Sequence, residues 1–223
     1  MPLKNALLTS ALATGIFMAQ LAGAQAPPPG APPAGSPPPA GPMRPASKNP
    51  ADAPAGTYTL DLLHSAVIAR ALHQGMSYNV LRFAVKQGSL VWDATNLSKV
   101  KLEVTVDTKP ITDPIVYRIK PESEVILDSA KFPEAKFVST AVRATGGNRY
   151  EIDGQLTLLG MTKPAQIQAS FVGTGRNMEG VTTLGFTGSM DINWPEYKRP
   201  GVASSSGVVK VDLDAEFMGA KGR

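Results

Sequence analysis

Alternation between apolar and polar side chains is the feature that most limits what this 223-residue chain can fold into. From Tyr150 to Leu158, every second residue is apolar or glycine, and the same pattern returns after "GMTKP". The positions on the apolar side are Ile152, Gly154, Leu156, Leu158, Ala165, Ile167, Ala169 and Phe171. Strict alternation predicts strands with one dry face and one wet face. The dry face could enclose a filled core or a ligand, or form the outside of a membrane barrel.

The same pattern continues through most of the chain after residue 56. It predicts further strands at 57–62, 66–75, 99–108, 135–144, 180–194 and 207–218, and a hairpin over 80–94 that turns at Gln87-Gly88. Asp113 followed by Pro114 predicts the start of a short helix. About eight or nine antiparallel strands without helical crossovers predict an all-β barrel or sandwich. A closed barrel would leave no exposed strand edge.

The first 24 residues are predicted to be a secretory signal peptide. Lys4 supplies a positive start, Leu7–Leu21 is an uncharged apolar run, and Ala22-Gly23-Ala24 supplies small residues for cleavage before Gln25. The alternative is an uncleaved anchor helix, but the apolar run is short for a membrane span and contains polar residues. The sequence therefore predicts export with cleavage of this segment.

Residues 25–56 are predicted to be a disordered linker, because twelve of the chain's 20 prolines lie between Pro27 and Gly56. Such a composition favours extended polyproline II and cannot bury a core. A docking motif for a proline-binding partner is the other interpretation, but the flanking residues do not support it. A single domain is then expected over residues 57–223.

Several classes of site are disfavoured by composition. The chain has no cysteine, which excludes disulfides, thiol catalysis and lipoprotein acylation, and its two histidines, His64 and His73, are too few for the usual zinc site. No metal or cofactor is therefore predicted. Beyond residue 56 the 19 basic and 17 acidic residues nearly balance, which argues against a nucleic-acid partner.

Five ordered segments resemble the YceI-like proteins, a family of bacterial periplasmic, polyisoprenoid-binding, lipocalin-like proteins. They are "YTLDLLHSAVIARALHQG", "RFAVKQGSLVWD", "SKVKLEVTVDTKPITD", "FPEAKFVST" and "YEIDGQLTLLGMTKPAQIQASFVG", from Tyr58 onward. The resemblance implies an antiparallel eight-stranded lipocalin-like β-barrel with a short helical insertion and an apolar lumen for a long-chain lipid. Two segments depart from the family pattern, "INWPEYKRPG" with Trp194 and "IKPESEVILDSAKF" with Leu127, and both are expected at the barrel mouth.

The predicted ligand-binding residues are the larger apolar members of the dry faces, together with one histidine. They are His64, Phe83, Trp92, Leu102, Val104, Leu156, Leu158, Phe171, Phe186 and Phe217. The aromatic residues among them could line a lumen or fill a core. His64 could bind a polar head group, but the interpretation in which His64 and Ser65 satisfy backbone groups within the protein is favoured. His73 is expected on the strand surface.

These residues predict an exported protein that holds a long-chain hydrophobic molecule, such as a polyisoprenoid, a quinone-like lipid or a fatty-acyl lipid. Its role would be transport, storage or stress protection, and a homodimer is possible. The alternative is a periplasmic adaptor whose filled barrel binds a partner protein. No enzyme is predicted, because no "G-x-S-x-G" elbow or phosphate loop is present. An outer-membrane barrel is rejected, because Lys101, Glu103 and Asp212 would face lipid.

Overall fold

The computed structural model describes residues 45–111, 120–197 and 207–220. The predicted signal peptide and the linker up to residue 44 lie outside the described residues. The expected helix start at Asp113 lies outside them as well.

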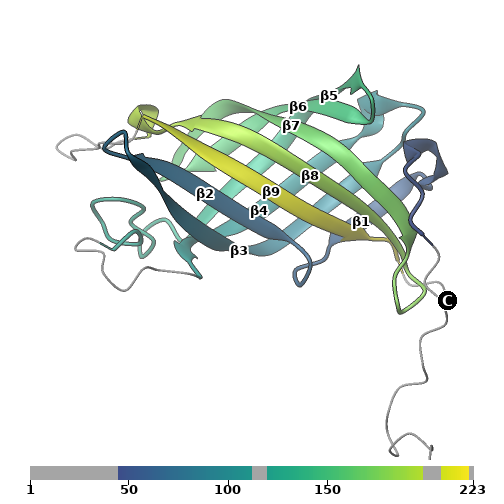
Figure 1. Cartoon of the computed structure of the whole chain (residues 1–223), viewed down its shortest axis with the longest axis horizontal. Coiled ribbons are helices and arrows are strands. Elements are labelled where there is room, and N and C mark those ends of the chain that lie inside the picture. Colours follow the sequence, from purple (N-terminus) through teal and green to yellow (C-terminus); the bar gives the residue numbers. More distant parts are fainter. Residues whose placement is uncertain (1–44, 112–119, 198–206, 221–223) are drawn as a thin grey trace, which may run out of the picture. The chain divides into compact units, whose positions relative to one another are not determined.

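Nine strand segments form one closed antiparallel barrel (Figure 1). They are β1 (Gly56–Leu60), β2 (Ala66–His73), β3 (Ser77–Trp92), β4 (Lys101–Pro110), β5 (Glu134–Gly146), β6 (Arg149–Leu158), β7 (Met161–Arg176), β8 (Thr182–Asn193) and β9 (Val208–Met218). β1 and β2 both pair with β3 and β9, so together they occupy one strand position of an eight-stranded barrel. The predicted fold class is confirmed.

The hairpin predicted over residues 80–94 is wrong. The segment belongs to one long strand, β3, whose register against β4 shifts between Phe83 and Gln87. These irregularities bend the strand around the barrel, and Gln87-Gly88 is not a turn. A Cβ at position 88 would lie 3.0 Å from the Leu60 side chain and 3.1 Å from the Glu103 carbonyl oxygen. The glycine therefore permits a close approach of neighbouring strands.

The β6–β7 hairpin answers the question raised by the alternation in residues 150–171. Leu156, Leu158, Ile167 and Ala169 are buried, whereas the intervening polar side chains lie on the outer face. The turn is shorter than the sequence predicts: Leu159 and Gly160 form it with positive φ angles of 53° and 73°. Residues 162–164 consequently belong to β7, where Thr162 pairs with Thr157.

The connection between β4 and β5 is described only from residue 120. Residues 120–133 form successive turns and no helix. Short 3-10 segments occur elsewhere, as η1 (Pro50–Asp52), η2 (Leu97–Lys99) and η3 (Trp194–Glu196). The turns of 120–133 lie at the same end of the barrel as the β2–β3 turn, the left end in Figure 1. We call this end the mouth; the end with the β5–β6 and β7–β8 turns is the closed end.

The linker prediction is wrong for its last residues. Residues 45–55, which we call the strap, pack against the closed end of the barrel. Ser47 and Thr174 exchange backbone hydrogen bonds of 2.8 and 2.9 Å, and the Asn148 Nδ2 donates to the Lys48 carbonyl oxygen at 2.6 Å. Ala53 is buried in the hydrophobic core. Proline content predicts an extended chain here, but it does not reveal that the barrel supplies partners for it.

Candidate functional site

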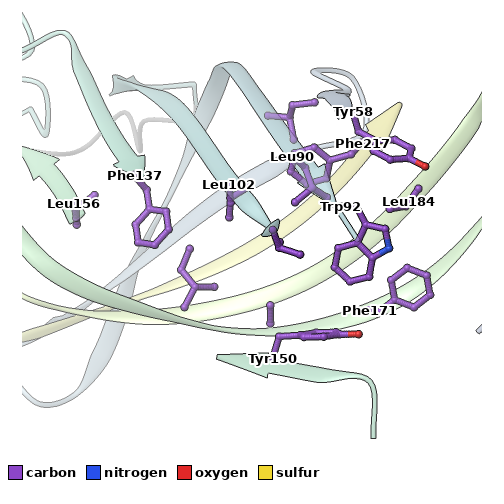
Figure 2. Close-up of a cluster of buried hydrophobic side chains, with 14 of the residues drawn as sticks. Tyr58, Leu90, Trp92, Leu102, Phe137, Tyr150, Leu156, Phe171, Leu184 and Phe217 are labelled. Carbon is purple, nitrogen blue, oxygen red and sulfur yellow. The ribbon is translucent and has the colours of Figure 1, made fainter. Parts of the chain in front are cut away.

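A cavity of about 750 Å³ occupies the inside of the barrel. Inward-facing residues of β2 to β9 line it, and most of them are aliphatic or aromatic. The volume falls within the usual range of small-molecule sites, roughly 300–1,000 Å³. Leu102, Phe137 and Leu156 lie along its wall (Figure 2). The strands thus enclose a space that their own side chains do not fill.

One end of this cavity is closed by aromatic rings in mutual contact. The Trp92 ring lies 5.6 Å from Tyr150 and 5.3 Å from Phe186, both edge to face, and is stacked at 6.1 Å on Phe171. Phe186 also contacts Phe217 at 6.1 Å between ring centroids. Figure 2 shows several of these side chains gathered beside Leu184. Edge-to-face contacts of this kind favour a fixed, close-packed arrangement.

The indole nitrogen of Trp92 is buried, and it has no hydrogen-bond partner among the described residues. In Figure 2 it lies on the side of Phe171 and Leu184, within the aromatic cluster. An unpaired N–H group in an apolar cluster carries a desolvation cost, which packing of the ring offsets.

The other end of the cavity reaches the surface and includes several polar lining residues. His73, Gln74 and Asn79 of the β2–β3 hairpin line it there, together with Asp107 and Thr108 at the end of β4. His73 and Gln74 are exposed, so the cavity opens to water between these elements. Further lining residues at this end are Pro121, Val125, Ile126, Leu127, Ile192 and Trp194. The cavity is therefore lined mainly by apolar side chains and opens to solvent at one end.

Eight of the ten residues predicted to contact ligand line this cavity. They are Phe83, Trp92, Leu102, Val104, Leu156, Leu158, Phe186 and Phe217. Phe171 is buried but lies in the aromatic cluster, outside the lining. His64 lies outside the cavity, in the loop between β1 and β2. Contact with a ligand stays a prediction for all of them.

His64 and its neighbours hold that loop against the barrel. The His64 Nδ1 lies 2.7 Å from the Asp61 carboxylate, and Asp61 also accepts the Leu63 backbone N–H at 2.8 Å. The buried Ser65 hydroxyl accepts the Glu216 backbone N–H at 3.2 Å. These bonds agree with the structural interpretation of the His-Ser pair.

Electrostatics couple the two side chains of this loop. The hydrogen bond and charge of Asp61 raise the pKa of His64 above its usual value. Burial acts to raise the pKa of Asp61, but hydrogen bonds from the His64 side chain and from the Leu63 and His64 backbone outweigh it, and this pKa is lowered. Each shift favours the charged form of its group.

Asp61, His64 and Glu216 are also the one group in the described parts of the chain whose atoms lie close enough to hold a metal ion, within 4.8 Å of one another. The hydrogen bonds above already engage Asp61 and His64. None of the three lines the cavity, although their neighbours Leu60, Ser65 and Phe217 do.

Sequence reasoning missed the smaller residues of the lining. Val67, Ala69 and Ala71 of β2, and Val211 and Leu213 of β9, contribute to the wall. Their alternation is visible in the sequence, but the predicted set of ligand-binding residues favours large side chains and omits them. Tyr150 and Ile152 of β6 also line the cavity and carry the same signal.

Comparison with known proteins decides the family. The sequence model of the YceI-like domain matches residues 58–217, almost the whole barrel. The chain belongs to the YceI-like family. Related members include a UPF0312 protein of Vibrio parahaemolyticus, 33% identical over 175 residues, which cover 77% of this chain and 91% of that protein. A UPF0312 protein of Pseudomonas savastanoi is 36% identical over 174 residues, with 76% and 88% covered.

Solved structures of similar fold support the assignment of this YceI-like barrel. Burkholderia cenocepacia BcnA matches with a TM-score of 0.57 and 20% identity, over 72% of this chain and 99% of that one. The Campylobacter jejuni YceI protein matches with a TM-score of 0.53 and 17% identity, over 62% and 82%. At such identities the likeness concerns the fold.

Family and fold together support a binding protein. Proteins of the YceI-like family are generally periplasmic. Within the described ranges, no helix is long and apolar enough to cross a membrane.

Proposed function

We propose that this protein is an exported carrier that holds one long-chain hydrophobic molecule inside its barrel. The ligand class is a polyisoprenoid, a quinone-like lipid or a fatty-acyl lipid, and its role is transport, storage or stress protection. The observation that carries the proposal is the cavity of about 750 Å³, dry at one end and open at the other.

The chemistry of the wall suits a chain of methylene or isoprene groups. Burying each methylene contributes about 0.8 kcal/mol, without any directional contact. A chain of ordinary lipid length can therefore gain its affinity from aliphatic and aromatic residues alone. This accounts for a lining in which Leu102, Leu156 and Ile167 are typical and catalytic groups are not needed.

The polar residues that line the cavity at the mouth suggest how such a ligand is oriented. Asn79 and Asp107 could hydrogen-bond a head group at the mouth, whereas the aromatic cluster offers mainly apolar surface. The tail would then enter first and stop against Trp92 and Phe186. The open cavity also weighs against the adaptor alternative, which assumes a filled barrel.

A cavity-filling substitution tests the proposal. Leu156 is buried in the wall, and the preceding Gln155 points to solvent from the same strand, so Leu156→Trp and Gln155→Trp form a matched pair. We expect Leu156→Trp to weaken binding of a fluorescent fatty acid by tenfold or more while unfolding of the delipidated protein is little changed. Gln155→Trp should leave both unchanged.

The opposite result would count against the proposal. In a filled core the same ring would overpack and cost about 1–3 kcal/mol of stability. Marked destabilisation by Leu156→Trp, together with unchanged binding of the fatty acid, would mean that no ligand occupies this space.

A further inference from the structure

The β2–β3 hairpin at the mouth has apolar side chains on its outer face as well as its inner one. Leu72 and Tyr78 are cross-strand neighbours, and Val80 follows Tyr78 on the same face. Val208 of β9 lies beside Leu72, because Ala71 pairs with Val209. All four are exposed, and Met76 projects at the turn with 75% of its surface in water. We call these five residues the tip patch.

The tip of the hairpin also lacks acidic residues, lysine and arginine. Between Arg70 and Arg82 the sequence "ALHQGMSYNVL" contains no aspartate, glutamate, lysine or arginine. Elsewhere the outer face of the barrel carries ion pairs, such as Arg70–Asp212 on β2 and β9 and Arg143–Glu151 on β5 and β6. The hairpin tip beside the opening is therefore a part of the outer surface that resembles the interior.

From this juxtaposition we propose that the tip patch docks the mouth onto a lipid bilayer, so that the ligand passes between membrane and cavity without crossing water. This inference rests on the proposed function. His73, Gln74 and Asn79 line the cavity on the same hairpin that exposes Leu72 and Tyr78. Insertion of the tip would place the opening in the interface of the bilayer.

A membrane fits this surface better than a protein partner. A stable protein–protein interface uses about 20–30 residues a side, whereas the tip patch has five. Shallow insertion into lipid needs much less, since the affinity scales with the few apolar side chains that are buried. A tyrosine beside aliphatic residues also suits the membrane interface, where its ring is apolar and its hydroxyl stays wet.

The ligand provides an independent reason. A molecule held by apolar burial loses that favourable free energy, for every methylene it exposes, if it leaves through water. Release by diffusion would therefore be slow for a long chain. Contact between mouth and bilayer replaces one apolar environment by another and removes this barrier.

The chain offers a matched control for the test. Met178 lies in the β7–β8 turn at the closed end and is 80% exposed, close to the value for Met76. Val172 is 45% exposed and Val80 42%. The mouth variant is Met76→Ser with Val80→Thr, and the control variant is Met178→Ser with Val172→Thr. None of these four residues lines the cavity.

The first measurement is flotation of delipidated protein with vesicles of phosphatidylethanolamine and phosphatidylglycerol. We expect the wild type and the control variant to float with the vesicles and the mouth variant to bind roughly tenfold more weakly, because each buried apolar side chain contributes strongly. The second is transfer of a bound fluorescent fatty acid to the same vesicles. Its rate should rise with vesicle concentration for the wild type and fall several-fold in the mouth variant.

The inference is overturned if the wild type does not bind vesicles, or if mouth and control variants behave alike. A wild-type dimer in solution that Met76→Ser with Val80→Thr dissociates would also overturn it, because a second copy would then cover the patch. These failures differ from failure of the proposed function. If the fatty acid binds the cavity but the protein does not bind vesicles, only the docking inference is contradicted. If vesicles bind and the fatty acid does not, the carrier function falls.

Discussion

The two ends of the barrel use the same alternating strands for different purposes. At the closed end, Trp92, Tyr150, Phe171 and Phe186 contact one another, and the strap packs alongside. At the mouth, the side chains on the inner face stand apart around an opening. The closed end resembles an ordinary protein core, whereas the mouth exposes apolar groups that burial would stabilise. The difference indicates that stability is concentrated at one end and access to the cavity at the other.

The two tryptophans provide the strongest test of this comparison. Trp92 is 2% exposed in the aromatic cluster, whereas Trp194 is half-buried at the mouth. We expect Trp92→Ala to lower the free energy of unfolding by about 3–5 kcal/mol, as large-to-small substitutions do in a close-packed core. Trp194→Ala should cost much less. Denaturant unfolding followed by circular dichroism measures both, and equal losses would contradict the distinction between the ends.

Removal of the strap tests whether contacts outside the barrel stabilise the closed end. A chain that begins at Pro45 retains the strap, whereas one that begins at Ala55 loses the Ser47–Thr174 pair and the burial of Ala53. A net contribution of about 1 kcal/mol per hydrogen bond suggests a loss of about 1–3 kcal/mol for the shorter chain. Thermal unfolding of the two truncated proteins checks this. Identical melting temperatures would mean that the strap does not support the closed end.

The loop with Asp61 and His64 belongs to neither end, so its effect should be smallest. The raised pKa of His64 gives stability that is present below pH 6.5 and lost as the pH rises through the raised value. The lowered pKa of Asp61 gives stability that is present above pH 3.8 and lost as the pH falls through the lowered value. His64→Gln should therefore lower the melting temperature most at pH values between the lowered pKa of Asp61 and the raised pKa of His64. A difference that does not change with pH would contradict the pairing.

Much of this fold could be predicted because alternation records which side of a strand is dry. It places Leu102, Leu156 and Leu158 on the inner face, and they line the cavity. The pattern cannot tell a turn from a bend within a strand, since both use glycine. It therefore predicts a turn at Gly88, although the role of this glycine is a close approach to Leu60 and Glu103.

The same limit applies to the site. Phe171 and Phe186 have the same sequence signal and both contact Trp92, but only Phe186 lines the cavity. Alternation does not record which of two packed rings faces the cavity. Likewise, composition predicts extended chain at residues 45–55, but not the hydrogen bonds from Asn148 and Thr174 that hold it. Such pairings join residues far apart in the sequence, where local patterns carry no information.

The central claim is that the barrel holds a long-chain molecule, and native mass spectrometry tests it most directly. Protein purified without detergent from its own cells should carry one additional mass per chain, which organic extraction recovers as a long-chain lipid. The Leu156→Trp variant prepared in parallel should lack most of that mass, and Gln155→Trp should retain it. Spectra without any bound molecule in every preparation, or an equal bound mass in Leu156→Trp, would contradict the account.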